Sequence, residues 1–189
     1  TGADTQRLQA VTTALHAEGF AERLLGFQAD VRDPQACADA VAATVQRFGM
    51  LHALVNNAGL GRITPTEHIE PVPFWEAPVD RWHAIMHTNA FGRFHMARAA
   101  VPHLLVAAQA SLARIVNIST SASTTLQLTP YGATKAALEM LSRYWARELA
   151  DRGVTVNVLL PGGAADTDII QGVGTGPLPT ELQDAVGEG

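Results

Sequence analysis

The sequence has only one cysteine, no cluster of basic residues and no long apolar run. Because a lone cysteine cannot form an internal disulfide, Cys37 favours a reducing, cytoplasmic setting and a buried thiol. A net charge of -5 argues against binding to nucleic acid, since neutralising phosphates requires a basic face. No segment reaches the roughly 18 apolar residues of a membrane span, and the first residues lack signal-peptide character. We therefore expect a soluble protein with no nucleic-acid or membrane partner.

Helical periodicity alternates along the chain with short apolar runs, and 47% of the residues are hydrophobic. This share is large enough for one buried core in a chain of 189 residues. The helices are expected at residues 5–18, 34–48, 80–103 and 131–152, and the strands at residues 25–29, 53–55, 115–118 and 154–160. Four strands that alternate with four helices predict a doubly wound α/β fold with a parallel sheet. We interpret residues 1–189 as a single domain of this kind.

Each predicted strand ends in polar or turn-forming residues. Asp30, Asn57, the region of Ser119 and Pro161–Gly162 all occupy such positions. In a doubly wound sheet, ligands bind outside the carboxyl ends of the strands. The sequence therefore predicts one binding site at this edge of the sheet.

Tyr131 and Lys135 lie four residues apart at the start of a predicted helix, so their side chains share one face. Lys135 is the only lysine, and all the other basic residues are arginines. A tyrosine is a poor base near neutral pH, but a nearby ammonium favours the phenolate and so lowers the pKa of the phenol. The pair fits acid/base catalysis, although the same spacing also occurs on ordinary helix surfaces. Neighbouring motifs decide between these two interpretations.

Five motifs make the sequence resemble the short-chain dehydrogenase/reductase family, and they follow the family's order over nearly the whole chain. The motifs are Asn56–Gly59, Asn89–Gly92, Ile118–Ser121, Tyr131–Lys135 and Pro161–Gly162. The resemblance implies a Rossmann-like fold and an oxidoreductase that moves a hydride between NAD or NADP and a small carbonyl or secondary alcohol. It also implies a homodimer or homotetramer, because the Asn89 helix and the Tyr131 helix pack between subunits in many members.

The resemblance further implies a role for each motif residue. Tyr131 would donate or accept the proton, Lys135 would hold the nicotinamide ribose and lower the tyrosine's pKa, and Asn89 would anchor a water that links the lysine to solvent. A hydroxyl of Thr120 or Ser121 would hydrogen-bond the substrate oxygen. The remaining implied cofactor contacts are Asp30 and Val31 at the adenine, Asn57, Ala58 and Gly59 at the middle of the cofactor, and Pro161, Gly162 and Thr167 near the nicotinamide.

The sequence departs from the family pattern at the catalytic hydroxyl and near both ends. In the family, the catalytic serine follows the strand asparagine by three positions and precedes the tyrosine by about twelve or thirteen. Here the position three after Asn117 is Thr120, which lies eleven residues before Tyr131 and has Ser119 and Ser121 on either side. The family's glycine-rich phosphate-binding turn does not occur, since Gly59-Leu60-Gly61 follows a later strand, and the family's last strand is missing. We therefore expect a fragment, or the ordered part of a longer protein, and the choice between NAD and NADP is left open.

Two alternatives to an active enzyme follow from these departures. One is a protein with the same fold that binds NAD(P) without turnover. The other is a structural fragment that binds nothing. Residues 166–182 resemble the family's mobile substrate lid in position, and their composition equally fits a plain surface loop.

Two further groups of residues have simple interpretations. His83, His87 and His95 lack an acidic partner at a matching spacing, so we expect no metal site. Trp75 and Trp82 flank the loop before the Asn89 helix, and we interpret them as core residues and not as a platform for the substrate.

Overall fold

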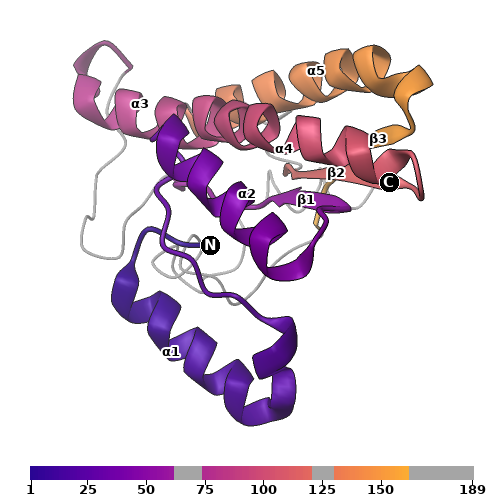
Figure 1. Cartoon of the computed structure of the whole chain (residues 1–189). Helices are drawn as coiled ribbons and strands as arrows, with labels where there is room; N and C mark the ends of the chain where they lie inside the picture. Colours follow the sequence, from indigo (N-terminus) through magenta and orange to yellow (C-terminus); the bar gives the residue numbers. More distant parts are fainter. Residues whose placement is uncertain (62–73, 121–129, 162–189) are drawn as a thin grey trace, which may run out of the picture.

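A three-stranded parallel sheet lies at the centre of the computed structural model, which describes residues 1–61, 74–120 and 130–161 (Figure 1). The strands are β1 (Ala53–Asn56), β2 (Ala113–Ile118) and β3 (Val154–Leu159), in the order β1-β2-β3. Asn56 pairs with Asn117, which pairs in turn with Val158. The carboxyl ends of all three strands therefore meet at one edge, as the sequence predicts.

The principal helices lie on both sides of this sheet. They are α1 (Thr5–Leu15), α2 (Pro34–Phe48), α3 (Val79–Met86), α4 (Gly92–Ala108) and α5 (Tyr131–Leu149). The shorter turns are π-helical at His16–Phe20 and His87–Phe91 and 3-10 at Ala21–Arg23, Phe74–Glu76 and Ala150–Arg152. In Figure 1, α2, α4 and α5 gather on one side of the sheet, while α1 lies on the other side and buries none of its residues. The doubly wound architecture predicted from the sequence is confirmed.

Local sequence explains where the helices begin and end. The Asp33 carboxylate accepts a hydrogen bond from the Gln35 N–H at 2.8 Å, and Pro34 occupies the first helical position of α2. The helical segment that starts with α5 ends before Gly153, whose φ of 74° lies in the left-handed region that favours glycine. These two boundaries are confirmed as predicted.

The prediction of a strand at residues 25–29 is wrong, because in the described structure Gln28 makes only an isolated bridge with Gly2. The apolar alternation in this segment is compatible with a strand. A strand also needs a neighbouring strand to pair its backbone groups. Among the described residues, this segment has only the backbone around Gly2 beside it. Three of the four predicted strands are therefore present.

The single helix predicted at residues 80–103 is interrupted by the π-helical turn η4 (His87–Phe91). The Gly92 N–H donates to the His87 carbonyl, five residues back, so one residue is added to the turn between α3 and α4. Hydrophobic periodicity does not reveal such a turn, because the apolar residues continue through it. Trp75, which was expected in the core, is also 72% exposed.

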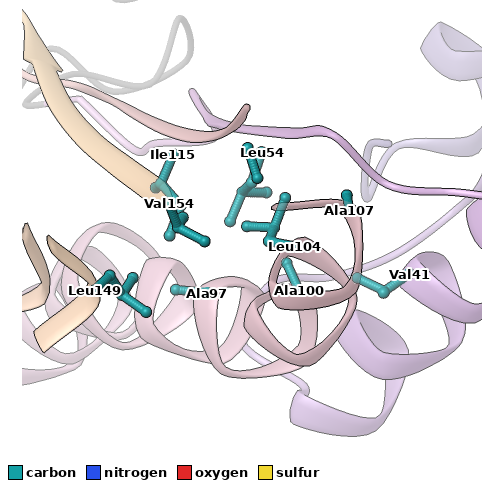
Figure 2. Packing of buried hydrophobic residues seen from close by; sticks show 10 residues of the cluster. Val41, Leu54, Ala97, Ala100, Leu104, Ala107, Ile115, Leu149 and Val154 are labelled. Carbon is teal, nitrogen blue, oxygen red and sulfur yellow. The ribbon is translucent and has the colours of Figure 1, made fainter. Parts of the chain in front are cut away.

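The core lies between α4 and the sheet (Figure 2). Small residues on α4 let its backbone approach the strands closely, and Figure 2 shows Leu104 beneath Leu54. The cluster consists of Val41, Leu54, Ala97, Ala100, Leu104, Ala107, Ala113, Ile115, Leu149 and Val154. The stripe on α4 recurs every three or four residues, as a helix packed on one face requires.

Replacing Leu104, which is fully buried, by alanine should lower the free energy of unfolding by about 2–5 kcal/mol, because the truncation leaves a cavity against the sheet. Val106→Ala is the matched control on the same helix, since Val106 is 57% exposed and its loss should change stability by less than about 0.5 kcal/mol. Urea denaturation followed by circular dichroism measures both. Equal destabilisation of the two variants would contradict this packing.

Candidate active site

A ladder of buried polar side chains crosses the sheet just below the carboxyl ends of the strands. The Asn56 Nδ2 donates to the Asn117 Oδ1 at 2.8 Å, and the Asn117 Nδ2 donates to the Ser142 Oγ at 2.8 Å. The Ser142 hydroxyl donates to the Leu138 carbonyl within α5 at 2.7 Å. The ladder fixes β1, β2 and α5 relative to one another. Asn56, at the end of β1, thus pairs with a side chain of the neighbouring strand.

Tyr131 and Lys135 share one face of the first turns of α5, at this same edge. Lys135 is 4% exposed, and its Nζ lies 5.3 Å from the centre of the Tyr131 ring. The Nζ donates to the Ile118 carbonyl at the end of β2, at 2.8 Å. The pair that the sequence indicates is therefore assembled beside the strand ends.

The pKa values of the two groups differ from the expectation. Burial lowers the pKa of Lys135 to about 7, and the charge of Arg93 lowers it too. Burial raises the pKa of Tyr131, and the cation that acts against this shift is also Arg93. The pKa of the phenol is therefore raised in this structure, where a lowered value was expected, because burial outweighs the charge of Arg93.

Asn89 is fully buried in η4, and its side-chain amide is completely engaged. The Oδ1 accepts from the Leu60 N–H at 2.8 Å, and the Nδ2 donates to the Leu60 carbonyl at 2.9 Å. The Nδ2 also donates to the Thr134 Oγ1 at 3.2 Å, and the Thr134 hydroxyl donates to the Tyr131 carbonyl at 2.7 Å. The amide therefore links the residues after β1 to the first turn of α5.

The hydroxyls after β2 differ in their surroundings. Ser119 is 3% exposed, and its Oγ donates to the Glu139 Oε1 on α5 at 2.7 Å. This contact commits the Ser119 hydroxyl to a carboxylate. Thr120 is half-buried at the same edge, whereas Ser121 lies outside the described residues.

Several of the residues expected at the cofactor line one cleft, with a volume of about 320 Å³. Among its walls are Val31, Asn57 and Ala58, together with Gly92 and Arg93. Gly59, which follows Ala58, is tightly surrounded: a Cβ there would lie 3.2 Å from the Asn89 Oδ1 and 3.3 Å from the Arg93 Nη2, so these side chains would have to move slightly. The middle group of expected contacts is therefore brought together at one place.

The other residues expected to contact the cofactor either do not line this cleft or lie outside the described residues. Both carboxylate oxygens of Asp30 accept hydrogen bonds from the Arg32 guanidinium, which holds the pKa of Asp30 below its usual range. Pro161 is exposed just after β3. Gly162, Thr167 and the expected lid at residues 166–182 lie outside the described residues.

Sequence reasoning missed Arg93, which is only 2% exposed. It lies four residues after Asn89 and four before Ala97, so it continues the buried stripe of α4. Its Nη1 donates to the Asn89 backbone carbonyl. Within residues 1–61, 74–120 and 130–161, the Arg93 Nε and Nη2 have no hydrogen-bond partner. A charged residue on an otherwise apolar helical stripe was the sequence feature that could have found it.

Two further properties of the described residues concern metal binding and membrane spanning. No group of three or more His, Cys, Asp or Glu side chains there is arranged to hold a metal ion. Nor does the described part of the chain contain a helix that is long and apolar enough to span a membrane.

Comparison with known proteins gives a consistent picture. The profile of the short chain dehydrogenase family matches residues 1–177. The 2,5-dichloro-2,5-cyclohexadiene-1,4-diol dehydrogenase LinX of Sphingobium indicum is 36% identical over 141 residues, which are 74% of this chain and 52% of that protein. The inactive 2-(S)-hydroxypropyl-CoM dehydrogenase 2 of Xanthobacter autotrophicus is 34% identical over 153 residues, 76% of this chain and 59% of that protein.

Among solved structures, a short chain dehydrogenase/reductase from Burkholderia phymatum in complex with NAD superposes with a TM-score of 0.73 and 26% identity. The match covers 84% of this chain and 54% of that one. The chain therefore spans little more than half the length of the relatives it matches.

The polar ladder gives a direct test of the architecture of the site. Asn117→Ala should lower the free energy of unfolding by about 2–4 kcal/mol, because the Asn56 amide and the Ser142 hydroxyl each lose a buried partner. The control is Asn157→Ala, since Asn157 is exposed on β3 and its loss should be nearly neutral. Chemical denaturation of both variants measures the difference. If Asn117→Ala proved as stable as its control, the ladder would have no energetic role.

Proposed function

Because the chain belongs to the short-chain dehydrogenase family, we propose that the protein is an NAD(P)-dependent oxidoreductase that acts on a carbonyl or a secondary alcohol. The observation that carries the proposal is the placement of Lys135. The chain's single lysine is almost fully buried, yet it lies against the Tyr131 ring beside the carboxyl ends of the strands. Burying an ammonium is costly, so a purely structural role does not account for it.

The residues of the cleft support a nicotinamide dinucleotide as the cofactor. Val31, Asn57 and Ala58 offer a mixed apolar and polar wall, and the missing side chain at Gly59 allows close approach of the backbone. Lys135 would hold the ribose hydroxyls of the nicotinamide half. When bound, this cofactor supplies or accepts the hydride, and the chain's own residues handle the proton.

Tyr131 is the proton donor in carbonyl reduction and the proton acceptor in alcohol oxidation. In reduction, its O–H bond breaks as the proton moves to the substrate oxygen, and oxidation reverses this transfer. A hydroxyl from Thr120 or Ser121 would donate a hydrogen bond to the same oxygen, which bears developing negative charge. The bond between Ser119 and Glu139 favours these two residues over Ser119.

A second candidate is a protein of the same fold that binds NAD(P) without turnover. Two observations favour it: a threonine at the position expected for the catalytic serine, and the relative from Xanthobacter autotrophicus that is described as inactive. This candidate predicts binding of NAD(P)H with no consumption of it across a panel of ketones and secondary alcohols.

We further propose that copies of the chain associate through α4, η4 and α5. Large apolar side chains are exposed there, namely Phe91 by 51%, Phe94 by 44%, Met140 by 65% and Tyr144 by 59%. The three elements adjoin one another, and exposed large apolar side chains on adjoining elements are typical of an interface. A dimer or tetramer would bury them.

Tyr131→Phe should reduce turnover by a factor of about 100 or more, because the phenyl ring keeps the packing but removes the proton that is transferred. The affinity for NAD(P)H should change little. The matched control is Tyr144→Phe, which makes the same chemical change at an exposed position of the same helix. Steady-state kinetics and titration of nucleotide fluorescence measure the two quantities. Equal turnover in both variants would exclude Tyr131 as the acid/base, and binding without turnover in the unmodified protein would favour the second candidate.

Met140→Glu should shift the protein toward monomers, because the new charge would be buried at the proposed interface. Val11→Glu on α1, at a position that is 51% exposed and lies outside this face, should leave the assembly unchanged. Sedimentation velocity over a dilution series distinguishes them. A wild-type protein that is monomeric at all concentrations would refute the interface.

A further inference from the structure

Arg93 is a buried cation without an anionic partner in the described structure. Its guanidinium is nearly inaccessible, and the Nη1 donates to the neutral Asn89 carbonyl. The Nε and Nη2 have no hydrogen-bond partner among the described residues. Burial lowers the pKa of Arg93 to about 10, so the group is still charged near neutral pH. Holding an unpaired charge in the interior is costly unless a compensating negative charge forms nearby.

The charged and titratable groups on the elements around this site include several of each sign. They are Tyr131, Lys135 and Glu139 on α5, Arg93 and His95 on α4, His87 on η4, Asp30, Arg32 and Asp33 before α2, and Cys37 on α2. The groups among them that become negative on ionisation are Asp30, Asp33, Cys37, Glu139 and Tyr131.

Four of these five groups are committed elsewhere. Asp30 is paired with Arg32, Asp33 caps α2 by accepting from the Gln35 N–H, and Glu139 accepts a hydrogen bond from the Ser119 hydroxyl. Burial raises the pKa of the Cys37 thiol to about 11, so this group stays neutral. Tyr131 is left as the group whose ionisation the charge of Arg93 can favour.

Hydrogen bonds join Arg93 to the turn that carries Tyr131. Arg93 holds the carbonyl of Asn89, the Asn89 amide holds Thr134, and the Thr134 hydroxyl holds the Tyr131 carbonyl. The charges of Arg93 and Tyr131 also interact, since each shifts the pKa of the other toward its ionised form.

We propose that Arg93 is a positioning residue that fixes the Asn89 turn and stabilises the negative charge on the Tyr131 oxygen whenever that hydroxyl has given up its proton. The inference rests on the proposed function, in which Tyr131 transfers the proton. Lys135 loses its charge near pH 7, whereas Arg93 keeps its charge through the whole neutral range. Arg93 is therefore the permanent cation of the site, and Lys135 is the one that titrates.

The two directions of the reaction give a test that a structural role would not pass. Oxidation requires the ionised tyrosine and reduction requires the protonated one. Arg93→Met should therefore lower kcat/KM for alcohol oxidation at about pH 8 roughly tenfold, and it should extend carbonyl reduction to higher pH. Arg93→Lys, which keeps the charge, should retain most of the oxidation. The control is Arg98→Met, which removes the same charge from an exposed position of α4.

A measurement that does not depend on turnover tests this inference independently of the proposed function. In protein labelled with ¹³C at the tyrosine Cζ, the Tyr131 resonance is assigned by its loss in Tyr131→Phe, and its pH titration is followed by NMR. Arg93→Met should move the Tyr131 titration to higher pH, while Arg98→Met should leave it in place. An unchanged titration in Arg93→Met, or equal losses of oxidation and reduction at every pH, would overturn the role of Arg93. Absence of turnover in the unmodified protein would refute the proposed function alone.

Discussion

The side chain of Asn89 ties together the three parts of the chain that form the site. Its amide makes a two-way pair with the backbone of Leu60, just after β1, and a third hydrogen bond to Thr134 on α5. A buried amide that is fully hydrogen-bonded has one stable orientation, because any rotation would leave polar atoms without partners. The π-helical turn η4 positions this residue, since the added residue turns it inward between the two neighbouring elements. The arrangement of Tyr131 and Lys135 at the strand ends depends on this link.

The site holds two buried basic side chains, Arg93 and Lys135, each of which donates to a neutral carbonyl oxygen. Lys135 donates to Ile118, and Arg93 donates to Asn89. A carbonyl oxygen satisfies hydrogen-bond geometry but supplies no net negative charge, so each cation keeps much of its desolvation cost. The carboxylates at the site are engaged with other groups, Asp30 with Arg32 and Glu139 with Ser119. Such a site favours any process that brings negative charge into it, including ionisation of a phenol or the approach of an anionic ligand.

The fold and the main pair of the site were largely predictable, whereas several individual contacts were not. Caps, glycine stops and apolar runs located α2, α5 and three strands, because these features act over a few neighbouring residues. The prediction of a strand at residues 25–29 was wrong because a strand forms only with a partner strand beside it. The expectation that Trp75 is buried was wrong because apolar character does not by itself decide which side of an element is covered. The polar ladder from Asn56 to Ser142 joins residues that are far apart in the chain, and no spacing rule connects them.

The sequence by itself determined that the carboxyl ends of parallel strands form one edge and that Tyr131 and Lys135 share one helical face. Both follow from backbone geometry, which repeats over short distances and is visible in local patterns. Only the tertiary structure decided that Ser119 binds Glu139, that two nitrogens of the buried Arg93 find no partner in the described part of the chain, and that the phenol's pKa is raised instead of lowered. Burial and charge depend on which distant segments pack together, because desolvation is a property of the assembled interior and not of any one segment.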